Sequence, residues 1–168
     1  EALARHKKRF GPMVNNPNFG TLFEGWGIGK EGFGGGTVNH AWSGGGLTVL
    51  SQYLCGIAPA NAAYKTILIM PQPGSVKSAS AQIASLVGKV SSAFTNSPDV
   101  FTLTTSIPAG SKGIIGIPNK GYHKIWLNGT LIWQSGKYLN TANADTGGDN
   151  DHIKFKVASG KWNFKAVK

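Results

Sequence analysis

From Tyr64 onward the chain consists of short runs in which apolar and polar side chains alternate, and this pattern constrains the fold most strongly. Gly, Pro, Asn and Asp separate the runs. Alternation over four to eight residues is typical of a β-strand with one buried face. The pattern predicts strands at 64–70, 78–86, 88–95, 100–107, 112–117, 122–127, 130–134, 152–157 and 161–166. Such short, closely spaced strands predict an antiparallel β-sandwich, and Asn128-Gly129 predicts a type I′ hairpin turn.

The first 60 residues differ in character. Residues 2–13 are predicted to form about three helical turns, and a glycine-rich loop follows over 20–36. Leucines at helical spacing predict a second helix from about Val38 to Gly56. Gly44-Gly45-Gly46 lies near its start, where each glycine costs about 1 kcal/mol relative to alanine. That cost predicts the close approach of another backbone or of a ligand. We therefore expect a mainly β chain with a helical part before a boundary near residue 60.

The chain is strongly basic, with 17 basic and 7 acidic residues and a net charge of +10. This charge raises the possibility of nucleic-acid binding. Beyond residue 60, however, all twelve basic residues are lysines, they are spaced singly, and no arginine follows Arg9. Nucleic-acid readers usually cluster Lys and Arg on one face. We therefore predict a lysine-rich surface and no nucleic-acid partner. No membrane span is expected either, because the longest strongly apolar run is Ile67–Met70 and a span needs about 20 residues.

Glu24 is the leading candidate for a catalytic group. It stands in Thr21-Leu22-Phe23-Glu24-Gly25-Trp26, within the glycine-rich loop. A carboxylate held between Phe23 and Trp26 would be partly desolvated and therefore a better base near neutral pH. Alternatively, Glu24 accepts hydrogen bonds from backbone amides of the loop and has only a structural role. The residue pattern alone leaves both interpretations open.

The segment Asn39-His40-Ala41-Trp42-Ser43 places His40 and Trp42 at the predicted start of the second helix. Unpaired amides at a helix start suit an oxygen-rich ligand, so Trp42 could stack on a sugar and His40 could bond a hydroxyl. A packed His–Trp pair is the alternative. Ser43 and His40 could also act as nucleophile and base, although no G-x-S-x-G elbow is present.

These motifs, taken in order, resemble the C-terminal end of bacterial α-L-rhamnosidases of glycoside hydrolase family 78. The matching stretches are Thr-Leu-Phe-Glu-Gly-Trp, Asn-His-Ala-Trp-Ser-Gly-Gly-Gly and Leu-Ser-Gln-Tyr-Leu-Cys-Gly-Ile-Ala-Pro. The resemblance implies that residues 1–60 are the last helices of an incomplete (α/α)6 barrel and that residues 61–168 are a jelly-roll-like β-sandwich. It also implies that Glu24 is the general base of an inverting hydrolysis, while Trp26, His40 and Trp42 bind the sugar.

The second catalytic group that such a reaction needs has no counterpart here. An inverting glycosidase requires a carboxylic acid about 6.5–9.5 Å from the base, and the resemblance places it earlier in the barrel. Two helices also cannot close a twelve-helix barrel. We therefore expect the C-terminal fragment of an α-L-rhamnosidase-like enzyme, inactive alone. Its implied partners are a rhamnosyl glycoside or polysaccharide and the missing N-terminal part of the same protein, in the periplasm or outside a bacterium.

Two further features allow other interpretations. In a rival, lectin-like β-sandwich, Trp126, Trp133 or Trp162 would stack on sugar, although their alternation with polar residues favours packing inside the sandwich. Calcium prefers carboxylate oxygens, so Asp145, Asp149 and Asp151 form a candidate calcium site, with a simple turn as the alternative. No other cofactor is expected.

Overall fold

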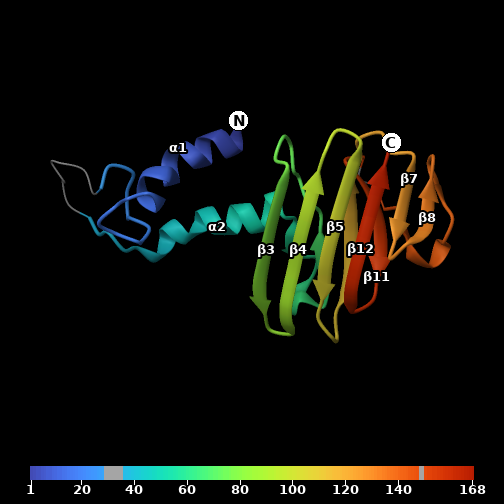
Figure 1. Ribbon diagram of the computed structural model, residues 1–168. Coiled ribbons are helices and arrows are strands. Elements are labelled where there is room, and N and C mark those ends of the chain that lie inside the picture. The colour runs from blue at the N-terminus through green and yellow to red at the C-terminus, as the bar shows by residue number, and fades with distance from the viewer. Residues whose placement is uncertain (29–35, 148–149) are drawn as a thin grey trace. The chain divides into compact units, whose positions relative to one another are not determined.

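The computed structural model describes residues 1–28, 36–147 and 150–168. The chain divides into two compact units, Glu1–Leu50 and Ser51–Lys168, which are described separately (Figure 1). In the described part of the chain, no helix is both long enough and apolar enough to cross a membrane.

The first unit contains the first predicted helical region and the start of the second, whose last turn continues into the second unit. Helix α1 spans Ala2–Val14 and matches the prediction closely. The second region is less regular than predicted, because a 3-10 turn at Ala41–Gly44 leads into the short helix α2 at Gly45–Val49, and a π-helical turn follows at Leu50–Leu54. Three glycines at its start weaken the preference for regular α-helix, which accounts for the irregular beginning.

Gly46 explains part of the glycine triplet. A Cβ built on Gly46 would lie 2.6 Å from the ring of Phe10 and 3.0 Å from Nε2 of His6, whereas Gly44 and Gly45 have open space at that position. Nε2 of His6 also lies 3.1 Å from the Gly46 carbonyl oxygen. A backbone or a ligand was expected close to the triplet, but the groups that approach Gly46 are side chains of α1.

The second unit is a β-sandwich. Its strands are β1 (Ile57–Pro59), β2 (Thr66–Ile69), β3 (Ser78–Ser85), β4 (Gly88–Asn96), β5 (Val100–Ile107), β6 (Lys112–Pro118), β7 (Lys124–Leu127), β8 (Thr130–Gln134), β9 (Lys137–Tyr138), β10 (Ala144–Asp145), β11 (His152–Val157) and β12 (Gly160–Val167). Short 3-10 turns lie at Ala62–Tyr64 and Thr141–Asn143. Every predicted strand is present, so the mainly β fold and the sandwich are confirmed.

The strands form two sheets. The five-stranded sheet has the order β1-β2-β6-β11-β10, and the seven-stranded sheet has the order β3-β4-β5-β12-β7-β8-β9. Among the strands of the described residues, β2 and β6 depart from the predicted antiparallel pairing and run parallel. Strands β3, β4 and β5 lie between them in the chain but in the other sheet. This crossover connection returns β6 in the same direction as β2.

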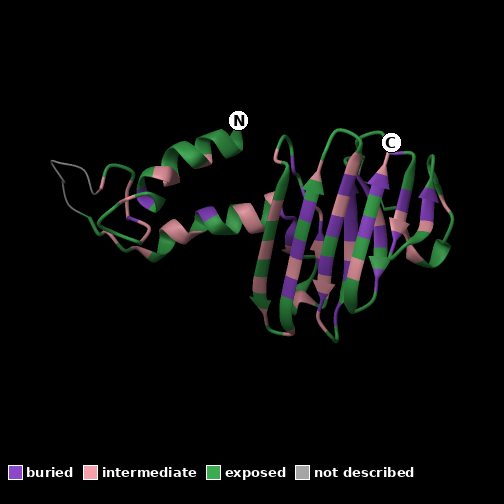
Figure 2. Cartoon of the chain, in the orientation of Figure 1, coloured by how far each residue is buried: buried purple, intermediate pink, exposed green. Residues whose placement is uncertain are grey.

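The core lies between the two sheets. Phe155 of β11 and Phe164 of β12 bring the sheets together, with their ring centroids 5.6 Å apart. Buried and exposed residues alternate along β4, β5 and β12 (Figure 2). Fully buried side chains come from both sheets and include Ile67, Ile69, Ile115, Ile117, Phe101, Leu103 and Ile125. Each contributes about 1.5–3 kcal/mol to stability, because its apolar surface is removed from water.

The hairpin between β7 and β8 has the predicted turn. Asn128 and Gly129 have φ angles of 48° and 85°, and positive values at both positions are those of a type I′ turn. The turn is fixed to β12, because Asn128 and Asn163 exchange two hydrogen bonds of 2.8 and 2.9 Å. The prediction of this hairpin is confirmed.

Candidate functional site

Two loop segments of the first unit lie antiparallel and bring Glu24 to His40. The backbone N–H of Glu24 donates to the Thr37 carbonyl at 2.9 Å, and that of His40 donates to the Leu22 carbonyl at 2.9 Å. The hydroxyl of Thr21 donates to the Val38 carbonyl. Residues 29–35, which contain Glu31, lie between these segments but outside the described residues. Backbone pairing therefore positions the predicted site residues.

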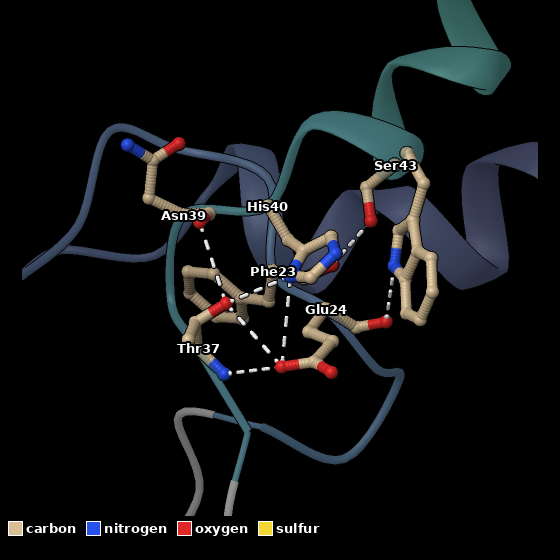
Figure 3. A network of polar contacts seen from close by, with 7 residues as sticks. Phe23, Glu24, Thr37, Asn39, His40 and Ser43 are labelled. Carbon is tan, nitrogen blue, oxygen red and sulfur yellow. Dashed lines mark hydrogen bonds and ion pairs between the residues drawn. The ribbon is translucent and has the colours of Figure 1, made fainter.

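The Glu24 carboxylate is held through one of its oxygens (Figure 3). Oε2 accepts the backbone N–H of Thr37 at 2.8 Å and the Thr37 hydroxyl at 3.3 Å, and it lies 3.6 Å from Nδ1 of His40. The side chain is 30% exposed. Among the described residues, Oε1 makes no hydrogen bond. The loop-amide interpretation of Glu24 is thus observed.

The hydroxyl of Thr37 links His40 to Glu24. It lies 3.0 Å from His40 Nδ1 and 3.3 Å from both Glu24 Oε2 and the Asn39 carbonyl oxygen. Toward His40 the hydroxyl donates or accepts according to which ring nitrogen carries the hydrogen.

His40 and Trp42 are packed together, and Trp42 also stays open to solvent. Their ring centroids lie 4.2 Å apart with a tilt of 37°. The indole N–H of Trp42 donates to the Glu24 carbonyl oxygen at 3.1 Å, which fixes the indole beside the loop. Trp42 is nevertheless 67% exposed. An indole held in this way can present a flat apolar surface to a ligand.

The aromatic residues that flank Glu24 in sequence contact residues of α1. Phe23 is buried, and its backbone N–H lies 3.4 Å from the sulfur of Met13. Trp26 packs on α1, where its ring centroid lies 5.0 Å from that of Phe10 and 5.6 Å from the guanidinium carbon of Arg9. Glu24 instead has polar neighbours. Thr37 contacts both Glu24 and His40, but its position in the sequence does not mark it as a site residue.

Ser43 has a structural contact here. Its hydroxyl donates to the carbonyl oxygen of Phe23, and its backbone N–H donates to the His40 carbonyl. Nδ1 of His40 is engaged with Thr37, not with Ser43. The arrangement therefore gives no support to a serine nucleophile activated by His40.

The acidic segment of the second unit forms a turn. Oδ1 of Asp145 accepts the backbone N–H of Gly147 at 3.1 Å. Asp149, part of the predicted calcium site with Asp145 and Asp151, lies outside the described residues. Within the described ranges, no three His, Cys, Asp or Glu residues are grouped so that they could hold a metal ion.

Comparisons with known proteins point to one family. A family model described as "Bacterial alpha-L-rhamnosidase C-terminal domain" matches residues 56–130. The chain is also similar to an alpha-L-rhamnosidase of Streptomyces avermitilis, with 41% identity over 66 residues. That match covers 39% of this chain and 6% of the relative.

Solved structures agree with this similarity. The chain resembles an alpha-L-rhamnosidase from Dictyoglumus thermophilum, with a TM-score of 0.71 at 20% identity, over 89% of this chain and 16% of that one. It also resembles the Streptomyces avermitilis alpha-L-rhamnosidase complexed with L-rhamnose, with a TM-score of 0.66 at 28% identity, over 89% of this chain and 14% of that one. The chain thus spans only a small part of the proteins that it resembles.

Proposed function

Since this chain is similar to the C-terminal part of bacterial α-L-rhamnosidases, we propose that it is the end of an inverting α-L-rhamnosidase-like glycoside hydrolase and carries the general base. The observation that carries the proposal is the Glu24 carboxylate, which is held through Oε2 by Thr37 while Oε1 makes no hydrogen bond to the described residues. The structural similarity covers 89% of the chain and so extends beyond the β-sandwich into the first unit. This extent supports assigning the first unit to the end of the (α/α)6 barrel.

Glu24 would act on water. Oε1 would take a proton from a water molecule as its oxygen forms a bond to the anomeric carbon. The glycosidic C–O bond breaks on the opposite side of the sugar, and a carboxylic acid protonates the departing oxygen. The exposed face of Trp42 and the ring of His40 would lie against the sugar, and Trp26 would bind it further from Glu24.

The acid would come from outside this chain. Glu1, the other acidic residue described in the first unit, pairs with Arg5 at 2.9 Å, and its side chain is 87% exposed. Such an exposed, paired carboxylate does not fit a general acid, whose protonated form is normally favoured by burial. We therefore propose that this chain alone has no glycosidase activity and works with the preceding part of the same protein.

The experiment compares Glu24→Gln with wild type in the full-length protein that contains this sequence. Hydrolysis of an aryl α-L-rhamnoside is expected to fall by about 10²–10⁴-fold in kcat, the usual contribution of a general base. NMR should show the β-anomer of rhamnose as the first product of the wild-type enzyme. Glu1→Gln is the matched control and should retain activity. The proposal would be overturned if Glu24→Gln kept full activity or if the first product were the α-anomer. Release of rhamnose by the isolated chain would also overturn it.

A second candidate function is sugar binding by the β-sandwich. Trp133 is only 8% exposed and Trp162 packs against the core, but Trp126 borders a shallow surface pocket of about 400 Å³. Thr102, Thr104, Asn163 and Lys165 also line this pocket. An indole beside such polar groups is a common platform for a sugar ring. Binding on a glycan array that survives Glu24→Gln and is lost in Trp126→Ala would favour this function.

We also propose that the intact protein works outside the cytoplasm, where it meets a rhamnosyl glycoside or polysaccharide. The support is its similarity to α-L-rhamnosidases. Fractionation of the source cells tests the location, and recovery of the protein with cytoplasmic markers would contradict it.

A further inference from the structure

Four segments that are distant in sequence meet at a pocket of the second unit, which we name the lysine pocket. It has a volume of about 760 Å³ and lies where β4, β12 and the loops before β3 and β7 come together. Its lining comprises Gly74, Ser75, Lys77, Thr95, Asn96, Ser97, Pro98, Lys120 and Lys168. Neither the Glu24 site nor the Trp126 pocket includes any of these residues.

Asn96 organises one side of the lysine pocket. Its Nδ2 donates to the Val76 carbonyl at 2.9 Å and to the Gly74 carbonyl at 3.3 Å, which ties β4 to the segment before β3. Its Oδ1 accepts from Nζ of Lys120 at 3.0 Å. Nζ of Lys120 also lies 3.5 Å from the Gly74 carbonyl oxygen. Contacts within the chain therefore hold the Lys120 ammonium in a defined position before any ligand binds.

The pocket holds positive charge that is not neutralised. In residues 1–28, 36–147 and 150–168, no carboxylate is paired with Lys77, Lys120 or Lys168. Burial lowers the pKa of Lys120, and the charge of Lys168 lowers it further. The two ammonium groups are thus close enough to repel each other. A bound anion would relieve this repulsion, because an opposite charge favours the charged form of a lysine.

We propose that the lysine pocket binds a carboxylate or sulfate group carried by an acidic glycan. Ser75, Thr95 and Ser97 also line the pocket, and hydroxyl groups suit sugar hydroxyls. The hydroxyls of Thr95 and Ser97 are already bonded to Thr102 and Val100, so Ser75 supplies the hydroxyl without such a contact to the described residues. Its volume lies within the range of small-molecule sites, about 300–1,000 Å³, and exceeds what a free inorganic anion fills. The lining residues include no aromatic side chain, so a nucleic-acid base would have no stacking surface. The anion preference follows from the lysines, while the choice of a glycan rests on the proposed function.

Calorimetric titration of the purified chain at low ionic strength tests the proposal. The probes are a hexasaccharide of mannuronate, the same hexasaccharide with its carboxylates reduced to alcohols, a sulfated hexasaccharide, inorganic sulfate, and a twelve-nucleotide single-stranded DNA. The carboxylated or the sulfated hexasaccharide should bind, and which of them binds identifies the anionic group. Lys120→Ala and Lys168→Ala should each weaken this binding about two- to fivefold, as expected for exposed charge pairs. The double variant should lose about tenfold, and added salt should weaken binding further.

Lys89→Ala is the matched control, because it removes one positive charge at the other end of β4 and should leave binding unchanged. Lys77→Ala serves as a second variant if Lys120→Ala fails to fold, as judged by circular dichroism. The proposal would be overturned if neither acidic hexasaccharide bound, or if the reduced hexasaccharide or inorganic sulfate bound equally well. It would also be overturned by tighter binding of the DNA, or by an equal loss of binding in Lys89→Ala. Glu24→Gln should leave this binding intact, so failure here is distinguishable from failure of the proposed hydrolase function.

Discussion

Nδ1 of His40 lies 3.6 Å from Oε2 of Glu24, and the hydroxyl of Thr37 contacts both atoms. Thr37 also donates its backbone N–H to the same carboxylate oxygen. One residue thus contacts both the carboxylate of Glu24 and the imidazole of His40. Thr37 is therefore a positioning residue for the proposed general base.

Replacing Thr37 with valine should lower catalysis in the full-length protein while leaving KM nearly unchanged. Valine keeps the backbone donor and the side-chain shape but removes the hydroxyl. A hydrogen bond to a charged group is worth about 1.5–3 kcal/mol, which corresponds to a loss of about 10- to 100-fold in kcat. Thr37→Ser keeps the hydroxyl and should restore most of the rate. An unchanged kcat in Thr37→Val would show that Thr37 does not position Glu24.

The site shows where sequence reasoning reaches its limit. Glu24, His40 and Trp42 could be singled out because their residue types and motifs suggest chemistry. Thr37 could not, because its role depends on an antiparallel approach of two loop segments that no local pattern encodes. The packing of the Trp26 ring on Phe10 of α1 likewise joins segments distant in sequence, and no local pattern encodes it.

The sandwich was more predictable because burial on one face leaves a two-residue period in the sequence. Strand β5 occupies the predicted range 100–107, with Phe101, Leu103 and Ile107 buried. Strands β1, β9 and β10 were not predicted, since two or three residues are too few to show a period. The parallel pairing of β2 with β6 depends on a contact between distant segments, which alternation does not specify.

Gly56 should tolerate no side chain. Its φ is +78°, and a Cβ there would lie 2.2 Å from the carbonyl carbon of Met70, a backbone atom that cannot move aside. Gly56→Ala should therefore lower the free energy of unfolding by about 3 kcal/mol or more. Gly110 has a similar φ of +83° with open space around it, so Gly110→Ala should cost only about 1–2 kcal/mol. Urea unfolding measures both values, and equal losses would contradict the clash with Met70.

Tyr122→Phe should stabilise the second unit. Tyr122 is 3% exposed, and its hydroxyl has no hydrogen-bond partner within the part of the chain that the structure describes. A buried polar group without a partner costs about 1–3 kcal/mol, so removing the oxygen should raise the free energy of unfolding by about 1 kcal/mol. Thermal and urea unfolding provide the measurement. Tyr138→Phe is the control and should destabilise, because the Tyr138 hydroxyl donates to the Lys154 carbonyl at 3.0 Å. A loss of stability in Tyr122→Phe would mean that its hydroxyl is satisfied.

Stability should fall at alkaline pH because burial raises the pKa of both Tyr122 and Tyr138. Between the unfolded tyrosine pKa of about 10 and the raised folded value, the unfolded state has lost a proton that the folded state retains. The unfolded state then binds fewer protons, so the free energy of unfolding decreases with pH, by at most about 1.4 kcal/mol per pH unit for each tyrosine. This contribution is fully present below about pH 10.

Cys55 and Lys120 also have shifted pKa values, and both affect how stability changes at alkaline pH. Burial raises the pKa of the Cys55 thiol, which adds to the fall, and lowers that of Lys120, which opposes it. The comparison that isolates a tyrosine is therefore wild type against Tyr122→Phe, by urea unfolding at steps between pH 8 and pH 11. The variant should lose stability less steeply above pH 10. If both proteins show the same slope, the Tyr122 hydroxyl titrates alike in the folded and unfolded states, and its burial does not contribute to alkaline unfolding.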